Sequence, residues 1–550
     1  MFRHEKMICS VVALSCAFLH ADATETALRL ELPAKGEVKV QTVNPNGRQR
    51  IYVSFDVPAS DIQQIWQPNL QQPFLERKWR LTANSSSMRD MPYMAFFNLA
   101  ETNRLSFVAE ALEWDCRISS KINQEKGVYA VTLTVAADAP GKIRPFKVTI
   151  DRRSIVWTEA LADWRNSLSY NKGRYPEAAW KPVYCTWYAV HAALSQDWVE
   201  RTGEIAAKLG FGTFILDDGW SYDESKRVNP DSIREWYRDV GEWDGFSFKK
   251  FPDFKAHRER MRALELKYLV WVSPYFIGTR SPAYARWRDR LSGQEPFEGN
   301  VLTDVSDAEM MESVTEQLVR LLKDSDLDGL KIDFLDYIKP SIEKPRSGFG
   351  YGYVRNLMNR LKSVKPDGLF EFRQSYATPL TLELGTQFRA GDVPFEWLCN
   401  ILRIAQIRLA VGDGVPVHAD PIFWSQHETK DNIARHFMAA MAGVPMLSMD
   451  LERLPTWQKE EVAKWMRVYS QRIEPFQKKG RWNMVYRNGS LAYVTSILVE
   501  EALVLVVDSG ASLKSLDCAL DGKRTIIMNL GYAPVCIRGT QVDPAQAVIP

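Results

Sequence analysis

The chain has 550 residues, a formal net charge of +2, and 45% hydrophobic and 25% charged residues. This length and apolar content predict two or three domains with large cores. The balanced charge, without long runs of one sign, speaks against a nucleic-acid-binding protein and against an interaction tail. The 18 Trp residues suit cores and also platforms for the flat faces of sugars.

Residues 1–23 are typical of an export signal. A basic start at residues 3–6 precedes the mostly apolar segment 7–19, and Ala21-Asp22-Ala23 fits a small-residue cleavage site. The apolar segment is too short to span a bilayer, and no later segment is long and apolar enough. We therefore predict export to the periplasm or the exterior. A lipid anchor at Cys16 is the alternative, because Ala13-Leu14-Ser15-Cys16 resembles a bacterial lipidation box.

The cysteines outside this signal are scattered, which speaks against a disulfide scaffold and against a zinc site. They are Cys116, Cys185, Cys399, Cys518 and Cys536. A disulfide between Cys518 and Cys536 within the C-terminal region is an alternative that stays open.

Residues 24–150 predict a β-sandwich, because short stretches alternate apolar and polar residues and are separated by Pro, Gly and Asn. The clearest strands are expected at 28–32, 38–43, 50–55 and 129–135. Residues 151–180 form a connector that contains Trp and Pro.

Between residues 181 and 477, short apolar runs alternate with segments of helical periodicity. Strands are predicted at 183–190, 213–216, 267–272, 329–334, 369–372, 387–390, 415–418 and 445–449. Helices are predicted at 196–209, 252–266, 308–323, 351–363, 396–409, 430–441 and 456–473. About eight βα units favour a central (β/α)8 TIM barrel. A doubly wound open sheet is the alternative, but no glycine-rich phosphate loop follows the first strand.

Residues 478–550 predict a small C-terminal β domain, with strands expected at 491–497, 502–507 and 524–530. The predicted fold class is therefore multi-domain α/β, with a barrel flanked by a β-sandwich and a small β domain.

The segment 329–336 organises the predicted barrel, because it is a buried strand that stops at Asp333. The carboxyl ends of all barrel strands meet at one mouth, where such barrels carry their chemistry. The side chains expected there are Asp217, Asp218, Trp220, Trp271, Lys331, Asp333, Arg373, Arg389, Asp392, His418, Asp420 and Trp424.

Carboxylates beside aromatic residues are what glycoside hydrolysis needs, since one carboxylate attacks the anomeric carbon and a second donates a proton to the leaving oxygen. A hard cation held by the same carboxylates is an alternative, but the interleaved Trp, Lys and Arg weigh against a metal. Single residues also have structural interpretations: Trp220 as core, Asp217 as a loop cap, and Arg389 as a partner of Glu396.

Four motifs resemble the melibiase group, the α-galactosidases of glycoside hydrolase family 36 and its clan. They are Leu216-Asp-Asp-Gly-Trp, Gly241-Glu-Trp followed by Lys250-Phe-Pro-Asp, Leu330-Lys-Ile-Asp-Phe and Phe388-Arg-Ala-Gly-Asp. The resemblance covers residues from about 180 to about 475. It implies that Asp333 is the nucleophile and Asp392 the acid/base. It also implies that Asp217 and Asp218 bind hydroxyls of the galactose ring. Lys331 corresponds to the Lys that precedes the nucleophile in the family, and Arg389 to the Arg that precedes the acid/base.

Two loops depart from the family. Residues 373–377 read Arg-Gln-Ser-Tyr-Ala, where many members carry a Cys- and Gly-rich loop that reads the 2-position of the sugar. Residues 274–276 read Pro-Tyr-Phe and lack the usual acidic residue. The substituent at C2 therefore stays open, and N-acetylgalactosamine or another galacto-configured sugar is an alternative to galactose.

The resemblance implies a retaining exo-α-galactosidase that needs no cofactor and acts on an oligosaccharide or glycoconjugate. A transglycosylating enzyme like the raffinose synthases is the second hypothesis. A carbohydrate-binding protein without catalysis is the third, and it would need a missing carboxylate, whereas Asp333 and Asp392 are both present.

Overall fold

The computed structural model describes residues 25–68, 75–76, 79–138, 143–170, 173–225, 235–291, 295–510, 516 and 520–550. The predicted export signal with Cys16, and Cys518 with its proposed disulfide, lie outside these residues. In the described parts of the chain, Cys116, Cys185, Cys399 and Cys536 are free thiols. No helix in these parts is long and apolar enough to cross a membrane.

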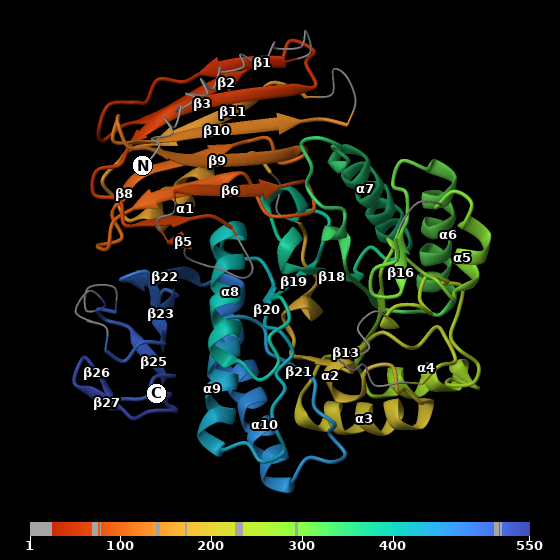
Figure 1. Ribbon diagram of the computed structural model, residues 1–550. Helices are drawn as coiled ribbons and strands as arrows, with labels where there is room; N and C mark the ends of the chain where they lie inside the picture. Colours follow the sequence, from red (N-terminus) through yellow and green to blue (C-terminus); the bar gives the residue numbers. More distant parts are fainter. Residues whose placement is uncertain are drawn as a thin grey trace, which may run out of the picture.

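A parallel barrel of eight strands forms the centre of the molecule, so the predicted fold class is confirmed (Figure 1). The strands are β12 (Val183–Cys185), β13 (Thr213–Leu216), β14 (Lys267–Val272), β17 (Gly329–Ile332), β18 (Leu369–Arg373), β19 (Gln387–Arg389), β20 (Val417–His418) and β21 (Met446–Leu447). Strand β12 pairs with both β13 and β21, and a bridge from His418 to Val444 links β20 toward β21. Each predicted barrel strand overlaps one of these eight.

Helices follow most of the strands. They are α2 (Trp187–Val190), α3 (Gln196–Leu209), α4 (Phe254–Ala263), α5 (Pro282–Trp287), α6 (Ala308–Asp324), α7 (Ser347–Val364), α8 (Trp397–Val411), α9 (Lys430–Ala440), α10 (Thr456–Val468) and α11 (Glu474–Lys479). After β17 and β18 lie the short 3-10 turns η3 (Leu335–Tyr337), η4 (Gln374–Tyr376) and η5 (Pro379–Thr381). A hairpin of β15 (Phe276–Gly278) and β16 (Asn300–Leu302) follows the third barrel strand.

Two predicted elements end five residues before their expected last residue, at Cys185 and at Val468. The strand expected at 183–190 ends at Cys185, because the backbone of Thr186 is helical and Trp187–Val190 form the single turn α2. The helix expected at 456–473 ends at Val468 and widens into the π turn η6 (Tyr469–Ile473). Pro475, at the start of α11, has no N–H for the helical ladder, and a widened turn accommodates that gap.

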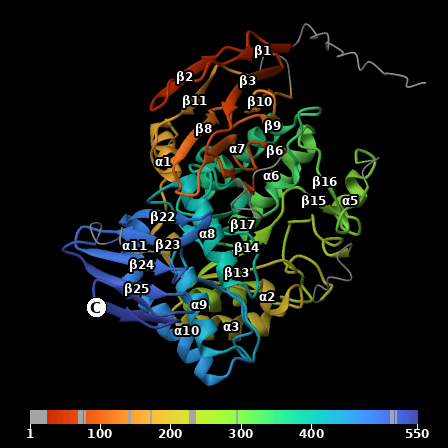
Figure 2. The same ribbon diagram turned by 60° about the vertical axis from the view of Figure 1, so that its left-hand side comes forward.

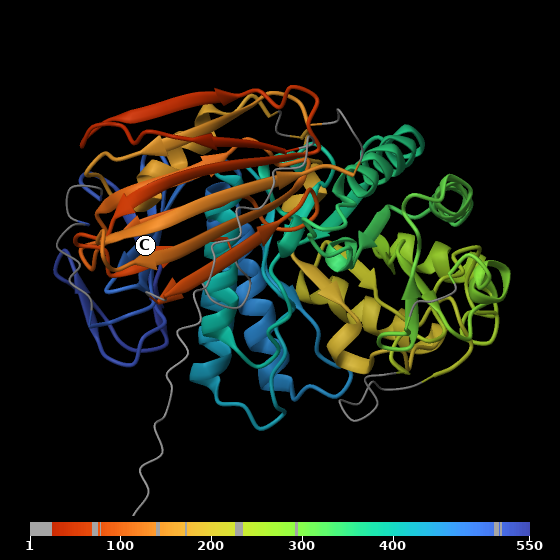
Figure 3. The same cartoon turned by 45° about the horizontal axis from the view of Figure 1, so that its top comes forward.

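Two antiparallel sheets form a sandwich that lies beside the barrel (Figure 3). The first sheet has the order β1 (Glu25–Arg29), β3 (Arg50–Pro58), β10 (Val128–Ala136), β9 (Asp115–Asn123) and β6 (Arg80–Ser85), with the pair β1–β3 parallel. The second has β2 (Val38–Val43), β11 (Phe146–Asp151), β8 (Asn103–Ala109), β7 (Tyr93–Phe97), β4 (Gln64–Trp66) and β5 (Leu75–Glu76).

A C-terminal sheet packs beside α8 and α9 (Figure 2). Its order is β22 (Arg481–Arg487), β23 (Ser490–Ile497), β24 (Glu501–Val506), β25 (Arg524–Asn529) and β28 (Gln546–Val548). A two-stranded ribbon of β26 (Val535–Ile537) and β27 (Thr540–Val542) accompanies it.

The connector between sandwich and barrel holds neighbouring parts of the fold together. It carries helix α1 (Trp157–Ser167), which packs on both β8 and α8, and the turn η1 (Glu177–Trp180). The Trp157 ring stacks on Phe97 of the sandwich with centroids 5.0 Å apart and lies 5.5 Å from Tyr486 of the C-terminal sheet. Trp157 therefore joins three parts of the fold.

Glu101 completes this junction. Its carboxylate is buried, accepts a hydrogen bond of 2.8 Å from Trp157 Nε1, and accepts another of 3.1 Å from the backbone N–H of Gly489. Burial raises the pKa of Glu101 against the effect of these two donors. The sandwich, the connector and the C-terminal sheet are thus tied to one carboxylate.

We expect Glu101→Gln to lower the free energy of unfolding by about 1–3 kcal/mol, because the amide turns an N–H group toward one of two buried donors. The measurement is urea denaturation followed by tryptophan fluorescence. Glu125→Ala, in the exposed hairpin turn between β9 and β10, is the control and should leave the transition unchanged. Equal stability of Glu101→Gln and the wild type would contradict the role of this junction.

Candidate active site

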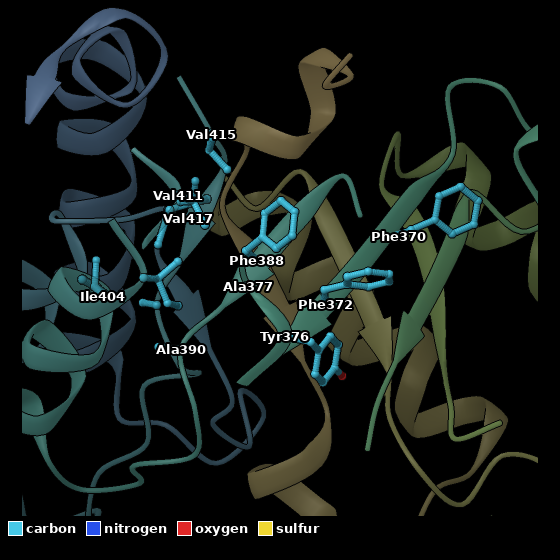
Figure 4. Packing of buried hydrophobic residues seen from close by; sticks show 14 of the residues in the cluster. Phe370, Phe372, Tyr376, Ala377, Phe388, Ala390, Ile404, Val411, Val415 and Val417 are labelled. Atoms are coloured by element: carbon cyan, nitrogen blue, oxygen red, sulfur yellow. The ribbon is translucent and has the colours of Figure 1, made fainter. Parts of the chain in front are cut away.

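Alternation along β18 and β19 separates apolar from charged side chains. Phe370, Phe372 and Phe388 belong to the core between strands and helices; Figure 4 shows them in one cluster with Val411 of α8 and Val417 of β20. Successive side chains of a strand point to opposite faces. The intervening residues therefore point into the barrel, and they are Glu371, Arg373, Gln387 and Arg389.

The strand register brings the inward residues side by side. Lys331 of β17 pairs in register with Glu371, and Arg373 pairs with Arg389. Trp271 of β14 is the register partner of Lys331 on its other side. A polar, charged layer thus fills the barrel just below its carboxyl-terminal mouth.

Asp333 sits directly after β17, and four neighbours hold its carboxylate. Oδ1 accepts hydrogen bonds from the backbone N–H of Phe334 (2.9 Å) and from Arg373 Nη1 (3.3 Å). Oδ2 accepts one from Trp271 Nε1 (3.2 Å) and lies 3.9 Å from Lys331 Nζ. Phe334 has φ +60°, an uncommon left-handed conformation for a bulky residue, which turns the chain away immediately after the carboxylate.

Asp392, on the loop after β19, is joined to Asp333 by two guanidinium groups. Arg373 Nη2 lies 2.5 Å from Asp392 Oδ2, and Arg389 Nη1 lies 2.8 Å from Asp392 Oδ1. Arg389 Nη2 lies 4.0 Å from Asp333 Oδ2. Because each guanidinium contacts both carboxylates through neighbouring nitrogens, the two carboxylates lie within about 10 Å of each other.

The two carboxylates differ in exposure. The side chain of Asp333 is 6% exposed, whereas that of Asp392 is 41% exposed and faces the mouth. Burial favours the neutral form of Asp333, but Arg373, Lys331 and Arg389 outweigh it and hold its pKa below the usual value. Partial burial also favours the neutral form of Asp392. The positive charges of Arg373 and Arg389 outweigh this effect, so the pKa of Asp392 lies far below the usual value. Without a ligand, both carboxylates are ionised.

The pair Asp217 and Asp218 follows β13 on the neighbouring side of the mouth. Asp217 Oδ2 accepts hydrogen bonds from Lys331 Nζ (2.7 Å) and from Cys185 Sγ (3.1 Å). Asp218 Oδ2 accepts one of 3.0 Å from Tyr222. Burial and the charge of Asp217 raise the pKa of Asp218 to about 7. Lys331 thus links the Asp-Asp pair to Asp333.

Trp271 and Trp220 form a buried layer beneath these carboxylates. Trp271 contacts Asp333 directly, and its ring stacks on Tyr237 with centroids 6.0 Å apart. Trp220 is fully buried, donates its indole N–H to the carbonyl of Trp271 (2.8 Å), and packs on Phe246. Trp271 therefore orients Asp333, and Trp220 supports Trp271. Stacking of either ring on a sugar stays a prediction.

His418, Asp420 and Trp424 are buried and bind other parts of the protein. His418 Nε2 lies 2.8 Å from the carbonyl of Ala179, and burial lowers its pKa to about 4. Trp424 donates its indole N–H to Gln458 (2.9 Å). Both side chains have at most 1% of their surface exposed, so the structure shows support at these positions, and sugar contact stays a prediction.

Asp420 holds Arg389 in place. Its Oδ1 lies 2.6 Å from Arg389 Nη1, and its Oδ2 accepts hydrogen bonds from the backbone N–H of Val393 (2.7 Å) and from the Tyr188 hydroxyl (3.1 Å). Burial raises the pKa of Asp420 to about 7 despite Arg389. Its predicted direct contact with sugar is untested, and the observed contacts fix the Asp392 loop.

Two supporting residues were missing from the predicted site. Glu371 Oε1 lies 3.3 Å from Arg389 Nε, and its Oε2 accepts a hydrogen bond from Gln387 (3.1 Å). Gln374 Oε1 accepts a hydrogen bond of 3.0 Å from the backbone N–H of Gly391, next to Asp392. Glu371 could have been identified from the strict alternation of β18, because this alternation puts Glu371 on the same face as Arg373. Among the described residues, no three His, Cys, Asp or Glu side chains are arranged to hold a metal.

The chain is similar in sequence to curated proteins that are named α-galactosidases. It is 27% identical over 200 residues to "Alpha-galactosidase Mel36A" of Lactobacillus acidophilus, a match that covers 34% of this chain and 26% of the relative. It is 24% identical over 355 residues to "Alpha-galactosidase 1" of Pediococcus pentosaceus, covering 59% of this chain and 46% of the relative. The matches thus span less than half the length of these curated relatives. No family model matches the chain.

The structure also superposes on solved structures of α-galactosidases, which have the same fold. The family 36 α-galactosidase AgaA of Geobacillus stearothermophilus, in a complex with raffinose, superposes with a TM-score of 0.64 at 14% identity over 84% of this chain and 69% of that one. The chain is thus similar in sequence to proteins named α-galactosidase and shares the fold of melibiase-type α-galactosidases of glycoside hydrolase family 36. TtGalA, the α-galactosidase of Thermus thermophilus, superposes with a TM-score of 0.57 at 16% identity over 83% of this chain and 95% of that one.

Gly219 of the Asp-Asp-Gly-Trp motif is required by the backbone. Its φ is +107°, and a Cβ there would lie 2.6 Å from Ala192 Cα. We expect Gly219→Ala to lower the free energy of unfolding by about 1–3 kcal/mol, because left-handed strain adds to this backbone clash. The measurement is chemical denaturation.

Gly245→Ala is the matched control, because a Cβ at Gly245 would meet nothing within 4 Å and its φ is not positive. If the two alanine variants are equally stable, the turn after Asp218 does not depend on glycine.

Proposed function

We propose that the protein is a retaining exo-α-galactosidase that removes terminal α-linked galactose, or a galacto-configured relative, from an oligosaccharide or glycoconjugate. The observation that carries the proposal is the carboxylate pair Asp333 and Asp392, bridged by Arg373 and Arg389 at the barrel mouth. Glycoside hydrolysis uses two carboxylates, which lie about 5–5.5 Å apart in retaining enzymes and about 6.5–9.5 Å apart in inverting ones. The related α-galactosidases support galactose as the sugar.

Asp333 is suited to be the nucleophile. It is ionised, lies on a rigid strand end, and is oriented by the indole N–H of Trp271 and the backbone N–H of Phe334. In the proposed first step one of its oxygens attacks C1, the bond from C1 to the leaving oxygen breaks, and a covalent glycosyl ester forms.

Asp392 is suited to be the acid/base because it is the more exposed of the two and faces arriving substrate. A sugar that covers its exposed face removes water from the carboxylate, which favours the protonated form. Asp392 then gives its proton to the leaving oxygen, and later takes one from the water that cleaves the ester.

Arg373 balances charge through both steps. Before attack Asp333 carries the negative charge and Asp392 is neutral; after ester formation Asp333 is neutral and Asp392 carries the charge. A single guanidinium in contact with both therefore keeps one anionic partner throughout, and no buried cation is left unpaired.

Asp217 and Asp218 are the proposed ligands of the galactose hydroxyls, with Lys331 between them and Asp333. Arg373 lies where many family members carry the loop that reads C2, so N-acetylgalactosaminide is the alternative substrate. Transfer to a sugar acceptor, as in raffinose synthases, is the alternative reaction. A panel of nitrophenyl α-glycosides and a competition between acceptor sugar and water would separate these alternatives. The features of residues 1–23 support the further proposal that the enzyme works outside the cytoplasm.

We expect Asp333→Gly to lower turnover of p-nitrophenyl α-galactoside by roughly a thousandfold or more, because the nucleophile is removed. Added azide should restore part of the activity and yield β-galactosyl azide, since azide enters on the face that Asp333 has vacated. Asp367→Gly, in the exposed turn before β18, is the control for the same substitution. Wild-type turnover in Asp333→Gly would remove Asp333 from the mechanism.

The pH dependence of kcat, which reports ionisations in the enzyme–substrate complex, should move when Arg373 is replaced. Activity rises with pH as Asp333 ionises and falls as Asp392 loses its proton. Arg373 lowers both pKa values, so Arg373→Met should move both limbs of the profile to higher pH and lower the maximum.

Arg355→Met, on the exposed side of α7, should leave the profile unchanged. Unmoved limbs in Arg373→Met would separate Arg373 from the two carboxylates.

A further inference from the structure

Hydrogen bonds hold the backbone of the loop that carries Asp392 at each residue from 391 to 393. Two N–H groups donate and one carbonyl accepts. The partners are Gln374 Oε1 for the N–H of Gly391 (3.0 Å), Arg403 Nη1 for the carbonyl of Asp392 (2.5 Å) and Asp420 Oδ2 for the N–H of Val393 (2.7 Å).

All three partners lead to one ridge of helix α8. Asn400, Arg403 and Gln406 are spaced three residues apart, and residues at this spacing form a ridge on a helix. Asn400 exchanges two hydrogen bonds of 3.0 Å with the backbone of Asp420, and Gln406 Oε1 accepts one of 2.9 Å from Gln374 Nε2. Since Arg403 contacts the loop directly, α8 supports the loop at three points.

The amide of Gln374 has one orientation that satisfies both of its neighbours. A backbone N–H can only donate, so the amide oxygen has to face Gly391. The amide nitrogen then faces Gln406, whose own oxygen accepts from it. The side chains of Gln374 and Gln406 are 8% and 6% exposed, so the loss of either contact would leave a buried polar group without a partner.

A small cavity lies at the far end of this pair of amides. It has a volume of about 30 Å³, and its lining includes Gln374, Ser375 and Gln406 of the barrel and Pro68 and Asp90 of the sandwich. Gln406 Nε2 and Ser375 Oγ are buried and have no hydrogen-bond partner among the described residues. A water molecule needs about 10–15 Å³ and at least two polar partners. The cavity therefore suits one water that accepts from Gln406 and bonds to Ser375.

The neutral form of Asp392 depends most on this support. The ion pairs with Arg373 and Arg389 hold the ionised carboxylate, whereas the proposed acid step needs the protonated one, which a guanidinium attracts less strongly. The side chain of Asp392 is also 41% exposed, so packing restrains it little. Its aim at the leaving oxygen then follows from the position of its backbone.

We propose that Gln374 is a positioning residue for the acid/base Asp392, and that Gln406 and one water molecule in the cavity fix its amide. The row of polar residues on α8 thereby sets the geometry of proton transfer. This inference rests on the proposed function.

The test compares kcat/KM for phenyl α-galactoside with kcat/KM for 2,4-dinitrophenyl α-galactoside. Phenolate is the poorer leaving group and needs the proton from Asp392, whereas dinitrophenolate leaves without it. Gln374→Leu should lower kcat/KM about tenfold for the phenyl galactoside and less than about twofold for the dinitrophenyl galactoside. Gln406→Leu acts one contact further away and should change this ratio in the same direction by a smaller factor, also if Gln374→Leu does not fold.

Azide gives a second measurement, because it attacks the glycosyl ester without help from a base. In Gln374→Leu the hydrolysis of the ester should limit kcat for the dinitrophenyl galactoside. Added azide should then raise kcat and yield α-galactosyl azide, which a loss of stability alone would not produce.

Gln477→Leu is the matched control. Gln477 is a buried amide that also contacts α8, through Arg408, and it donates to the carbonyl of Met441 (2.7 Å). This variant should lose stability without a change in the ratio of the two kcat/KM values or in the response to azide. The same change of ratio in Gln477→Leu, or an equal fall for both substrates in Gln374→Leu, overturns the positioning role.

Crystal structures of the wild type and Gln374→Leu do not depend on turnover. Asp392 should be displaced in the variant, and one water should occupy the cavity of the wild type. An unmoved Asp392 or a dry cavity overturns the inference. A wild type that cleaves neither galactoside, together with a displaced Asp392 in the variant, would overturn the proposed function and leave the support of the loop standing.

Discussion

The double bridge from Arg373 and Arg389 to Asp333 and Asp392 is the interaction on which the mouth of the barrel depends. Arginine stays charged at any pH that a protein survives, and both side chains lie largely within the protein. A buried charge without a partner is strongly destabilising, so each guanidinium has to be surrounded by carboxylates. The same requirement brings together two acids from strands that are separate in sequence.

The same need to pair buried charges applies deeper inside the barrel. Arg389 contacts Glu371 and Asp420 as well as the two acids at the mouth, and Lys331 is shared by Asp217 and Asp333. Ion pairs and hydrogen bonds in a low-dielectric interior strengthen one another, so the loss of one member affects the others. The rigid arrangement around Asp333 is therefore a property of the whole charged layer, with Trp271 and Trp220 packed beneath it.

The sequence predicted the barrel well because each of its strands is a short apolar run bounded by polar residues, a pattern that depends on local burial. The ends of elements were predicted less well, because they depend on tertiary packing as well as on local sequence. Trp187–Val190 continue an apolar run, yet they form a helical turn beyond β12. The positions of Asp333, Arg373 and Asp392 at one mouth followed from parallel topology. That Glu371 and Asp420 pair with Arg389 could not be predicted from spacing, because they lie on or directly after the strands on either side of β19, which are β18 and β20, and the pairing depends on strand register. The meeting of residues 82–91 with the loop after β17 depends on how two domains pack, which no local pattern encodes.

The junction at Glu101 has a consequence for how the chain reaches its native state. Glu101 is synthesised well before its donor Gly489, which follows 388 residues later. Contacts between such distant segments form late, because closing a long loop costs entropy before any contact repays it. The sandwich and connector must therefore keep an unfilled acceptor until Gly489 has been synthesised. A truncation that removes the last sheet would leave the buried carboxylate of Glu101, at the other end of the sequence, without its Gly489 donor.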